Sequence, residues 1–149
     1  MMLDIDYQIL KIIYRNGNKL RLKQIQLEIK AIKRVEIPLS TINSCLERLE
    51  KVGFVNWVRY SHIELTKNGL DLAKELSRHA QLLELFLYNE LDLSIDKAHT
   101  ESEKLNLLFS CDIINKICEK YNHPNYCPCG EEIPNSKSCY CGRENSELN

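Results

Sequence analysis

Apolar residues recur every three or four positions in three stretches of the first 53 residues, and this spacing predicts three amphipathic helices. The stretches are residues 4–14, 21–32 and 40–53, and their apolar positions are Ile5, Ile9, Ile12, Ile13, Leu22, Ile25, Ile29, Ile32, Ile42, Cys45, Leu46, Leu49 and Val52. Asn16-Gly17 predicts a turn after the first helix. Because Pro38 disfavours helical backbone at Ile37, we expect a break there, with Ser40 as the N-cap of the third helix.

Two short β-type runs follow the third helix. Residues 54–58 and 62–65 are rich in β-branched and aromatic side chains, and the polar residues 59–61 lie between them. This pattern predicts a β-hairpin. Three helices followed by a hairpin are typical of a winged helix-turn-helix, which we predict for residues 1–67.

A long helical pattern begins after Thr66, which we expect to cap the helix. Its apolar stripe takes positions 72, 76, 80, 83, 87 and 91, over roughly 25 residues. Such a long helix in a chain of 149 residues needs a partner, and a second subunit is the simplest one. Two more helices are expected over 95–109 and 111–121. The predicted fold is mainly α with a small hairpin wing: a winged helix, a helical domain over 68–123 and a Cys-rich tail over 124–149.

The charge is unevenly distributed along the chain. Residues 1–68 carry 12 basic and 7 acidic side chains, whereas residues 69–149 carry 8 and 14. A basic front and an acidic back suggest that the winged helix faces a polyanion.

The third helix is short and polar on its outer face, so it can enter the major groove of DNA. Hydroxyl and amide groups at its N-terminal end can reach base edges or phosphates, the start of the second helix can contact the backbone, and the wing tip can approach phosphate or the minor groove. The predicted DNA-binding residues are Lys23, Gln24, Pro38, Ser40, Thr41, Asn43, Ser44, Arg59, Tyr60 and His62. The same side chains could instead be solvated, with Ser40 only capping its helix.

Other classes of protein lack support in the sequence. No run of apolar residues is long enough to span a membrane, and the start MMLDIDYQIL lacks the basic patch of a secretory signal. We therefore expect a cytoplasmic protein with no membrane partner. We see no nucleophile–base constellation, phosphate-binding loop or His-rich zinc site, so we do not expect an enzyme.

Several motifs together resemble the DtxR/MntR family of metal-dependent transcriptional repressors. They are LTKNG after the wing, SRHAQLLELFLYNELDL, AHTESEKLNLLFS and HPNYCPCGEEIP, and they extend the resemblance over residues 4–134. The resemblance implies a winged helix followed by a helical dimerisation and metal-binding domain. It also implies a homodimer that binds double-stranded, palindromic operator DNA and responds to Fe²⁺ or Mn²⁺.

The family's metal ligands are only partly present. Glu84 and His99 match two ligands of the ancillary site, while Ala80 takes the place of its histidine and His79 lies one residue away. At the regulatory site Glu103 matches one ligand, but the other positions hold Gln8, Asn106 and Leu107. Amides supply no charge and leucine supplies no ligand atom, so we expect a weakened regulatory site.

The seven cysteines form two groups. Cys45, Cys111 and Cys118 lie on apolar helix stripes and are expected in the core. Cys127, Cys129, Cys139 and Cys141 form CPCG and CYCG pairs, and Gly130 and Gly142 permit tight turns. Four thiolates predict a structural zinc tetrathiolate, although zinc knuckles usually separate each pair by two residues. An iron–sulfur cluster, a reactive-thiol sensor and a flexible tail remain alternatives, as does metal sensing transferred to this tail.

The sequence thus favours a dimeric DNA-binding regulator, which we expect to be a repressor modulated by a transition metal. The alternative is a winged-helix and zinc module that binds proteins in a transcription assembly without responding to metal.

Overall fold

The structure, a computed structural model, describes residues 2–141. The chain divides into two compact units, Met1–Ala73 and Lys74–Asn149, which we call the N-terminal and C-terminal units. Within residues 2–141, no helix is both long enough and apolar enough to cross a bilayer.

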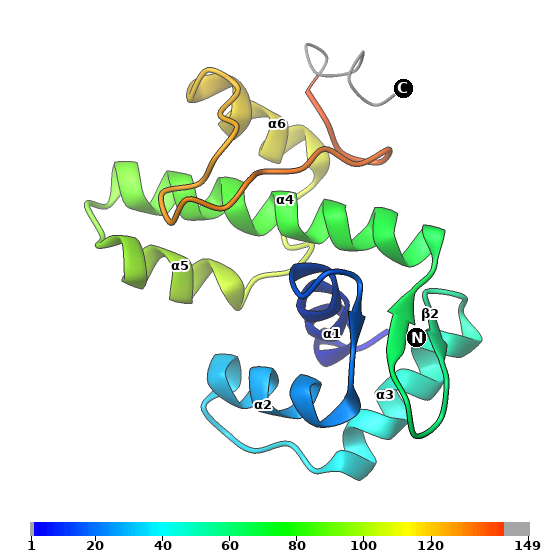
Figure 1. Ribbon diagram of the computed structural model, residues 1–149. Coiled ribbons are helices and arrows are strands. Elements are labelled where there is room, and N and C mark those ends of the chain that lie inside the picture. Colours follow the sequence, from blue (N-terminus) through cyan, green and yellow to red (C-terminus); the bar gives the residue numbers. More distant parts are fainter. Residues whose placement is uncertain (1, 142–149) are drawn as a thin grey trace. The chain divides into compact units, whose positions relative to one another are not determined.

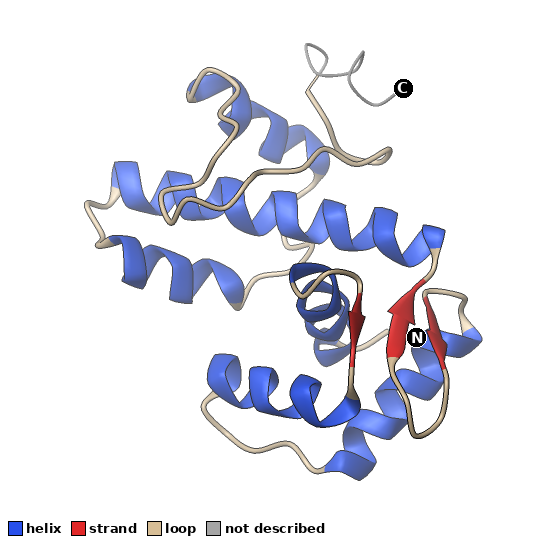
Figure 2. Ribbon diagram, in the orientation of Figure 1, coloured by secondary structure: helices blue, strands red, loops and turns tan. Residues whose placement is uncertain are grey.

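The N-terminal unit is a winged helix (Figures 1 and 2). Its elements are α1 (Asp4–Arg15), β1 (Lys19–Leu20), α2 (Leu22–Lys33), α3 (Leu39–Lys51), β2 (Val55–Trp57) and β3 (Ile63–Leu65). The strands form an antiparallel sheet in the order β1-β3-β2, with Ile63 paired to both Leu20 and Trp57. The predicted fold is confirmed. The apolar stripes of the helices are buried, including Ile9, Ile13, Ile25 and Leu46 at 0% exposure.

Two local predictions in this unit need correction. The third helix begins at Leu39 with Pro38 as its N-cap, so Ser40 lies inside the helix and accepts a hydrogen bond from Ser44 Oγ at its carbonyl. The strand β1 was not expected. It follows the turn at Gly17, where φ is +87°, and is only two residues long, too short to give a periodic signal.

The C-terminal unit is built on α4 (Lys67–Glu90), whose first turns belong to the N-terminal unit. Figure 1 shows α5 (Ile95–Glu103) running beside α4, with α6 (Cys111–Lys120) and an extended segment on another side. This segment, residues 124–141, is called the tail below; the predicted tail residues 142–149 lie outside the described residues. The predicted helix 95–109 ends early at Glu103, because Lys104 and Leu105 make three-residue turns and Ser102 Oγ bonds to His99 O.

The tail packs on the middle of α4. Gln81 Nε2 donates to Glu132 O at 2.9 Å, and Ile133 packs against the cluster Leu82, Leu83, Ile114, Cys118, Cys139 and Cys141. All residues from Leu76 to Glu84 are buried, polar and apolar alike. The middle of α4 is therefore covered around its circumference, rather than along the one stripe that its leucines predict.

Candidate metal centres and DNA-binding face

The N-terminal end of α3 presents small polar side chains to solvent. Pro38, Ser40, Thr41 and Ser44 are exposed, and Asn43 is half-buried. The N-terminus of a helix favours a phosphate because its first amides point outward and carry partial positive charge. Most of the predicted α3 residues therefore lie on a surface that a polyanion can reach.

At the start of α2, the two predicted residues have different local roles. Gln24 Oε1 accepts from Arg21 N at 3.2 Å and so closes the first turn of the helix. Lys23 is exposed, and its Nζ donates to Gln26 Oε1 at 3.0 Å. Lys23 thus presents a positive charge at the start of α2, where it can meet a phosphate.

The wing holds its three predicted residues in different ways. Tyr60 is fully exposed at the tip, in a left-handed backbone conformation with φ +65°. The guanidinium of Arg59 lies 3.5 Å from the ring centroid of Trp57, a cation–π contact that keeps the cation on the wing. His62 is half-buried between Ser61 Oγ at 2.9 Å and Glu64 Oε2 at 3.4 Å. Tyr60 and Arg59 are therefore the accessible groups.

An ion pair between buried Asp6 and partly exposed Arg48 joins α1 to α3. Both carboxylate oxygens of Asp6 accept hydrogen bonds from Arg48, each at 3.0 Å, and Asp6 is 0% exposed. Burial alone would raise the pKa of Asp6, but the hydrogen bonds and charge of Arg48 lower it below its usual value. The pair fixes the position of α3 on the core.

In the C-terminal unit, Glu84 and His99 meet as the resemblance implies. His99 Nδ1 lies 2.9 Å from Glu84 Oε1, and Glu84 is 1% exposed. The hydrogen bond from Glu84 raises the pKa of His99, with the charge of nearby Glu103 adding to the effect. For Glu84, burial acts upward, but the bonds to His99 and Cys129 lower the pKa overall. Each side chain of the pair therefore favours the charged form of the other.

The tail adds a sulfur ligand to this pair. Cys129 Sγ, a Glu84 oxygen and a His99 ring nitrogen lie within 4.8 Å of one another, and Cys129 N donates to Glu84 Oε2 at 3.3 Å. Cys127 Sγ is 2.9 Å from Cys129 Sγ. The CPCG turn closes through Gly130, whose φ of +94° only glycine adopts readily. A thiol thus stands near the place where the family's histidine is missing.

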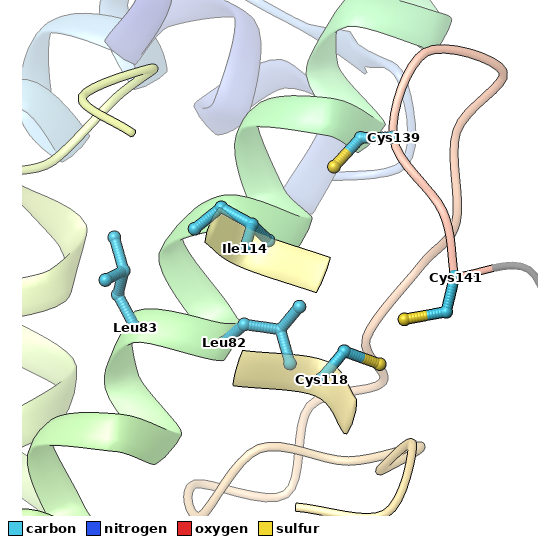
Figure 3. Close-up of a cluster of buried hydrophobic side chains, with 6 residues drawn as sticks. All are labelled: Leu82, Leu83, Ile114, Cys118, Cys139 and Cys141. Atoms are coloured by element: carbon cyan, nitrogen blue, oxygen red, sulfur yellow. The ribbon is translucent and has the colours of Figure 1, made fainter. Parts of the chain in front are cut away.

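The second cysteine pair of the tail lies elsewhere. Cys139 Sγ is 3.3 Å from His79 Nε2, while the sulfurs of Cys141 and Cys118 lie side by side with His123 nearby. Figure 3 shows the sulfur of Cys139 apart from those of Cys118 and Cys141. The predicted zinc tetrathiolate requires all four tail thiols to surround one point. In the structure they lie in separate places instead. The spacer between the pairs runs along α4, held by the bond from Gln81 to Glu132, and this docking separates them.

Arg78 lies between the second pair of thiols. It is 1% exposed and donates from Nη1 to Cys139 Sγ at 3.0 Å and from Nη2 to Cys141 Sγ at 3.5 Å. Burial raises the pKa of Cys139 to about 12, although the charge of Arg78 acts in the opposite direction. Burial and the charge of Arg78 lower the pKa of His79 to about 4, so its ring is neutral at pH 7.

The three cysteines expected in the core behave differently. Cys45 and Cys118 are buried at 1% and 5% exposure, as expected. Cys111 is only half-buried, and its sulfur contacts His79 Nε2 at 3.6 Å, Glu75 Oε2 at 3.7 Å and Ser138 O at 3.3 Å. The helix stripe places Cys111 on the inner side of α6, but the groups that it meets there are polar.

The positions of the family's regulatory metal site hold Gln8, Glu103, Asn106 and Leu107. Gln8 is buried in α1 of the N-terminal unit, and Glu103 and Asn106 are buried in the C-terminal unit. Leu107 is 37% exposed. Glu103 alone brings a charge, so these residues supply a weak set of metal donors.

Sequence reasoning missed Arg78, His79, Cys111 and Glu75 as a group. A signal was present in SRHAQ: four of these five successive residues are polar, although they lie in the middle of a helix with an apolar stripe. Polar side chains in such a place need partners, and the tail supplies them.

The architecture is thus a winged helix followed along the chain by a helical unit that holds a buried glutamate–histidine pair. Residues 66–135 match the family model "Iron dependent repressor, metal binding and dimerisation domain". The resemblance to the DtxR/MntR family of metal-dependent repressors is thereby confirmed over these residues, which make up just under half of the chain.

Individual relatives agree with this assignment. The iron-dependent repressor IdeR of Mycobacterium leprae is 25% identical over 123 residues, 83% of this chain and 54% of IdeR. A manganese-dependent transcriptional repressor solved with manganese has a TM-score of 0.76 and 28% identity, over 91% of this chain and 60% of that one. The hypothetical protein SSo2273 from Sulfolobus solfataricus has a TM-score of 0.64 and 25% identity, over 86% of this chain and 95% of that one. The chain spans about half the length of IdeR.

Proposed function

We propose that this chain is a DNA-binding transcriptional repressor, active as a dimer on a palindromic operator and modulated by a divalent transition metal. The observation that carries the proposal is the combination, in one chain, of an exposed α3 N-terminus and a Glu84–His99 pair joined by Cys129. The names of the relatives, which are iron- and manganese-dependent repressors, support the same function.

DNA contact would come from three places on the N-terminal unit. Ser40, Thr41 and Ser44 at the start of α3 would face base edges or phosphates in the major groove. Lys23 at the start of α2 would contact the phosphate backbone. Arg59 and Tyr60 on the wing would approach the neighbouring groove, with Arg59 leaving the Trp57 ring if a phosphate competes for its charge.

The effector metal would be held by Glu84, His99 and Cys129. Their ligand atoms fit a single ion because all lie within 4.8 Å of one another, and Cys127 is in contact with Cys129. A thiolate among the ligands favours Fe²⁺ or Zn²⁺ over Mn²⁺, which prefers oxygen. When bound, the metal supplies positive charge that draws the three side chains together. Glu84, His99 and Cys129 lie on α4, α5 and the tail, so the ion would tie these segments to one another.

A second copy of the chain would pair through the C-terminal unit. This unit exposes large apolar side chains, among them Leu91, Ile95, Leu108, Phe109 and Ile113, at 43–65% of their surface. Burying these side chains against a second copy would remove their apolar surface from water. Two winged helices per assembly would then match the two halves of a palindrome.

Selection of duplexes from a random library, followed by titration of the selected duplex across a salt series, tests DNA binding. We expect the affinity to fall steeply with salt, because each neutralised phosphate releases counterions. Lys23→Gln should lower the slope of log affinity against log salt by about 1. Lys116→Gln removes a charge from α6, where the side chain is 78% exposed, and should leave the slope unchanged.

The same experiment separates the two functions that the sequence left open. A protein-interaction module would enrich no duplex and show no such slope. Equal slopes for Lys23→Gln and Lys116→Gln would contradict the proposed contact at the start of α2.

A further inference from the structure

A second group of metal-binding side chains lies on α4 away from Glu84. His79 Nε2 is 3.3 Å from Cys139 Sγ and 3.6 Å from Cys111 Sγ, and the three ligand atoms lie within 4.8 Å of one another. Glu75, one helical turn before His79, places Oε2 at 3.7 Å from Cys111 Sγ, although its carboxylate is not within 4.8 Å of all three of these atoms. The donors thus come from α4, the start of α6 and the tail.

These separations suit tetrahedral zinc. With Zn–S bonds of about 2.3 Å and Zn–N bonds of about 2.0 Å, neighbouring ligand atoms in a tetrahedron lie roughly 3.5 Å apart. His79 Nε2 lies 3.3 Å from Cys139 Sγ and 3.6 Å from Cys111 Sγ, and Glu75 Oε2 lies 3.7 Å from Cys111 Sγ, so all three distances are near this value. Two sulfurs, one imidazole nitrogen and one carboxylate oxygen are also the ligand types that zinc takes in proteins.

The charges around the group would balance with a bound Zn²⁺. Arg78 is buried, and among the described residues its hydrogen-bond acceptors are two sulfurs. Zinc binds cysteine as the thiolate, and in the zinc-bound state the Cys139 thiolate would give the buried guanidinium a negative partner. Two thiolates and the Glu75 carboxylate offset the two charges of zinc and the one charge of Arg78.

We propose that Glu75, His79, Cys111 and Cys139 form a structural zinc site that fastens the tail to α4 and α6. Four protein ligands leave no open position for substrate or solvent, which is the arrangement of structural zinc. The site shares no residue with Glu84, His99 and Cys129, and it stands whether or not those residues sense a metal.

The structure offers a third group, Cys118, His123 and Cys141, that must be distinguished from this one. Like the first group, it has three members, and its sulfur–nitrogen contact, from Cys118 to His123 Nδ1, is 3.6 Å. A Cys118→Ser variant separates the two possibilities.

Elemental analysis of the full chain, purified without added metal and dialysed against a weak chelator, tests the proposal. We expect about one Zn²⁺ per chain, lost in Cys111→Ser and in His79→Gln. Zinc should be retained in Cys118→Ser and in the double variant Cys127→Ser/Cys129→Ser. Retention in Cys111→Ser, or loss only in the Cys127/Cys129 variant, would overturn the proposal.

The unmodified chain provides a test that does not depend on the folding of variants. Alkylation followed by mass spectrometry should show Cys111 and Cys139 becoming at least several-fold more reactive when a strong chelator is added. Cys45, a buried thiol of the N-terminal unit, serves as the internal control and should not change. If Cys111 and Cys139 react equally with and without chelator, the site does not exist.

Discussion

Single side chains in this molecule act through partners on other elements. Asp6 of α1 receives two hydrogen bonds from Arg48 of α3, and Glu84 of α4 binds both His99 of α5 and the backbone of the tail. In each case a buried carboxylate keeps a lowered pKa because the partner outweighs the effect of burial. These carboxylates therefore hold elements together only while they are charged.

The Asp6–Arg48 pair predicts a pH-dependent stability. Because the folded-state pKa of Asp6 lies below 3.8, its contribution is present above that pH and is lost as the pH falls through the lowered value. We expect Asp6→Asn to be less stable than wild type at pH 7, with the difference shrinking below pH 3.8. Urea denaturation at a series of pH values measures the two free energies of unfolding.

Glu47→Gln provides the matched control for this prediction. Glu47 is exposed on α3, the helix that carries Arg48, so its replacement should change stability little at any pH. A gap between Asp6→Asn and wild type that stays constant down to pH 2.5 would contradict the assigned role of the pair.

Among the elements, the junction between β3 and α4 explains the LTKNG motif. Thr66 Oγ1 donates to Gly53 O at 2.6 Å and accepts from Gly69 N at 3.0 Å, so it caps α4 as expected from the sequence. A Cβ atom at Gly69 would lie 1.9 Å from Phe54 O, closer than any side chain permits. The motif thus combines a helix cap with a close approach of two backbone segments.

Removing the cap should destabilise the winged helix by about 1 kcal/mol. Thr66→Ala loses the acceptor for Gly69 N, whereas Thr66→Ser keeps the hydroxyl group. Thermal and urea unfolding should therefore place Thr66→Ser close to wild type and Thr66→Ala below it. Equal destabilisation by both variants would show that the threonine methyl group matters more than the cap.

Across the whole molecule, the sequence predicts the winged helix but not the arrangement of the tail. The winged helix was predictable because Ile9, Ile25 and Leu46 repeat at helical spacing and each helix buries its own stripe. The division of the tail thiols was not predictable. Spacing along the chain puts Cys127 and Cys139 in similar motifs, but their partners, Glu84 and His79, lie on α4, and only the docked tail reveals them.

The alignment with the family also gave no metal-binding role to His79. The ligand position falls on Ala80, and one residue turns a side chain by about 100° around the helix. The structure shows that His79 faces the tail, where Cys139 and Cys111 meet it. Whether a helix face is buried depends on which segment packs against it. The tail has no periodic pattern, so its path over α4 could not be predicted from the sequence.

The most direct test of a metal-modulated repressor is whether a metal ion changes its affinity for DNA. Fluorescence anisotropy would measure the affinity of wild type and of Glu84→Gln for the selected duplex. Each protein would be measured after treatment with a chelator and again with Fe²⁺ added under anaerobic conditions. We predict that the metal tightens binding of wild type by about 5- to 150-fold, a usual range for coupling between sites, and leaves Glu84→Gln unchanged. Glu101→Gln, on the exposed side of α5, should respond as wild type does. Equal affinity of wild type with and without metal would contradict the account.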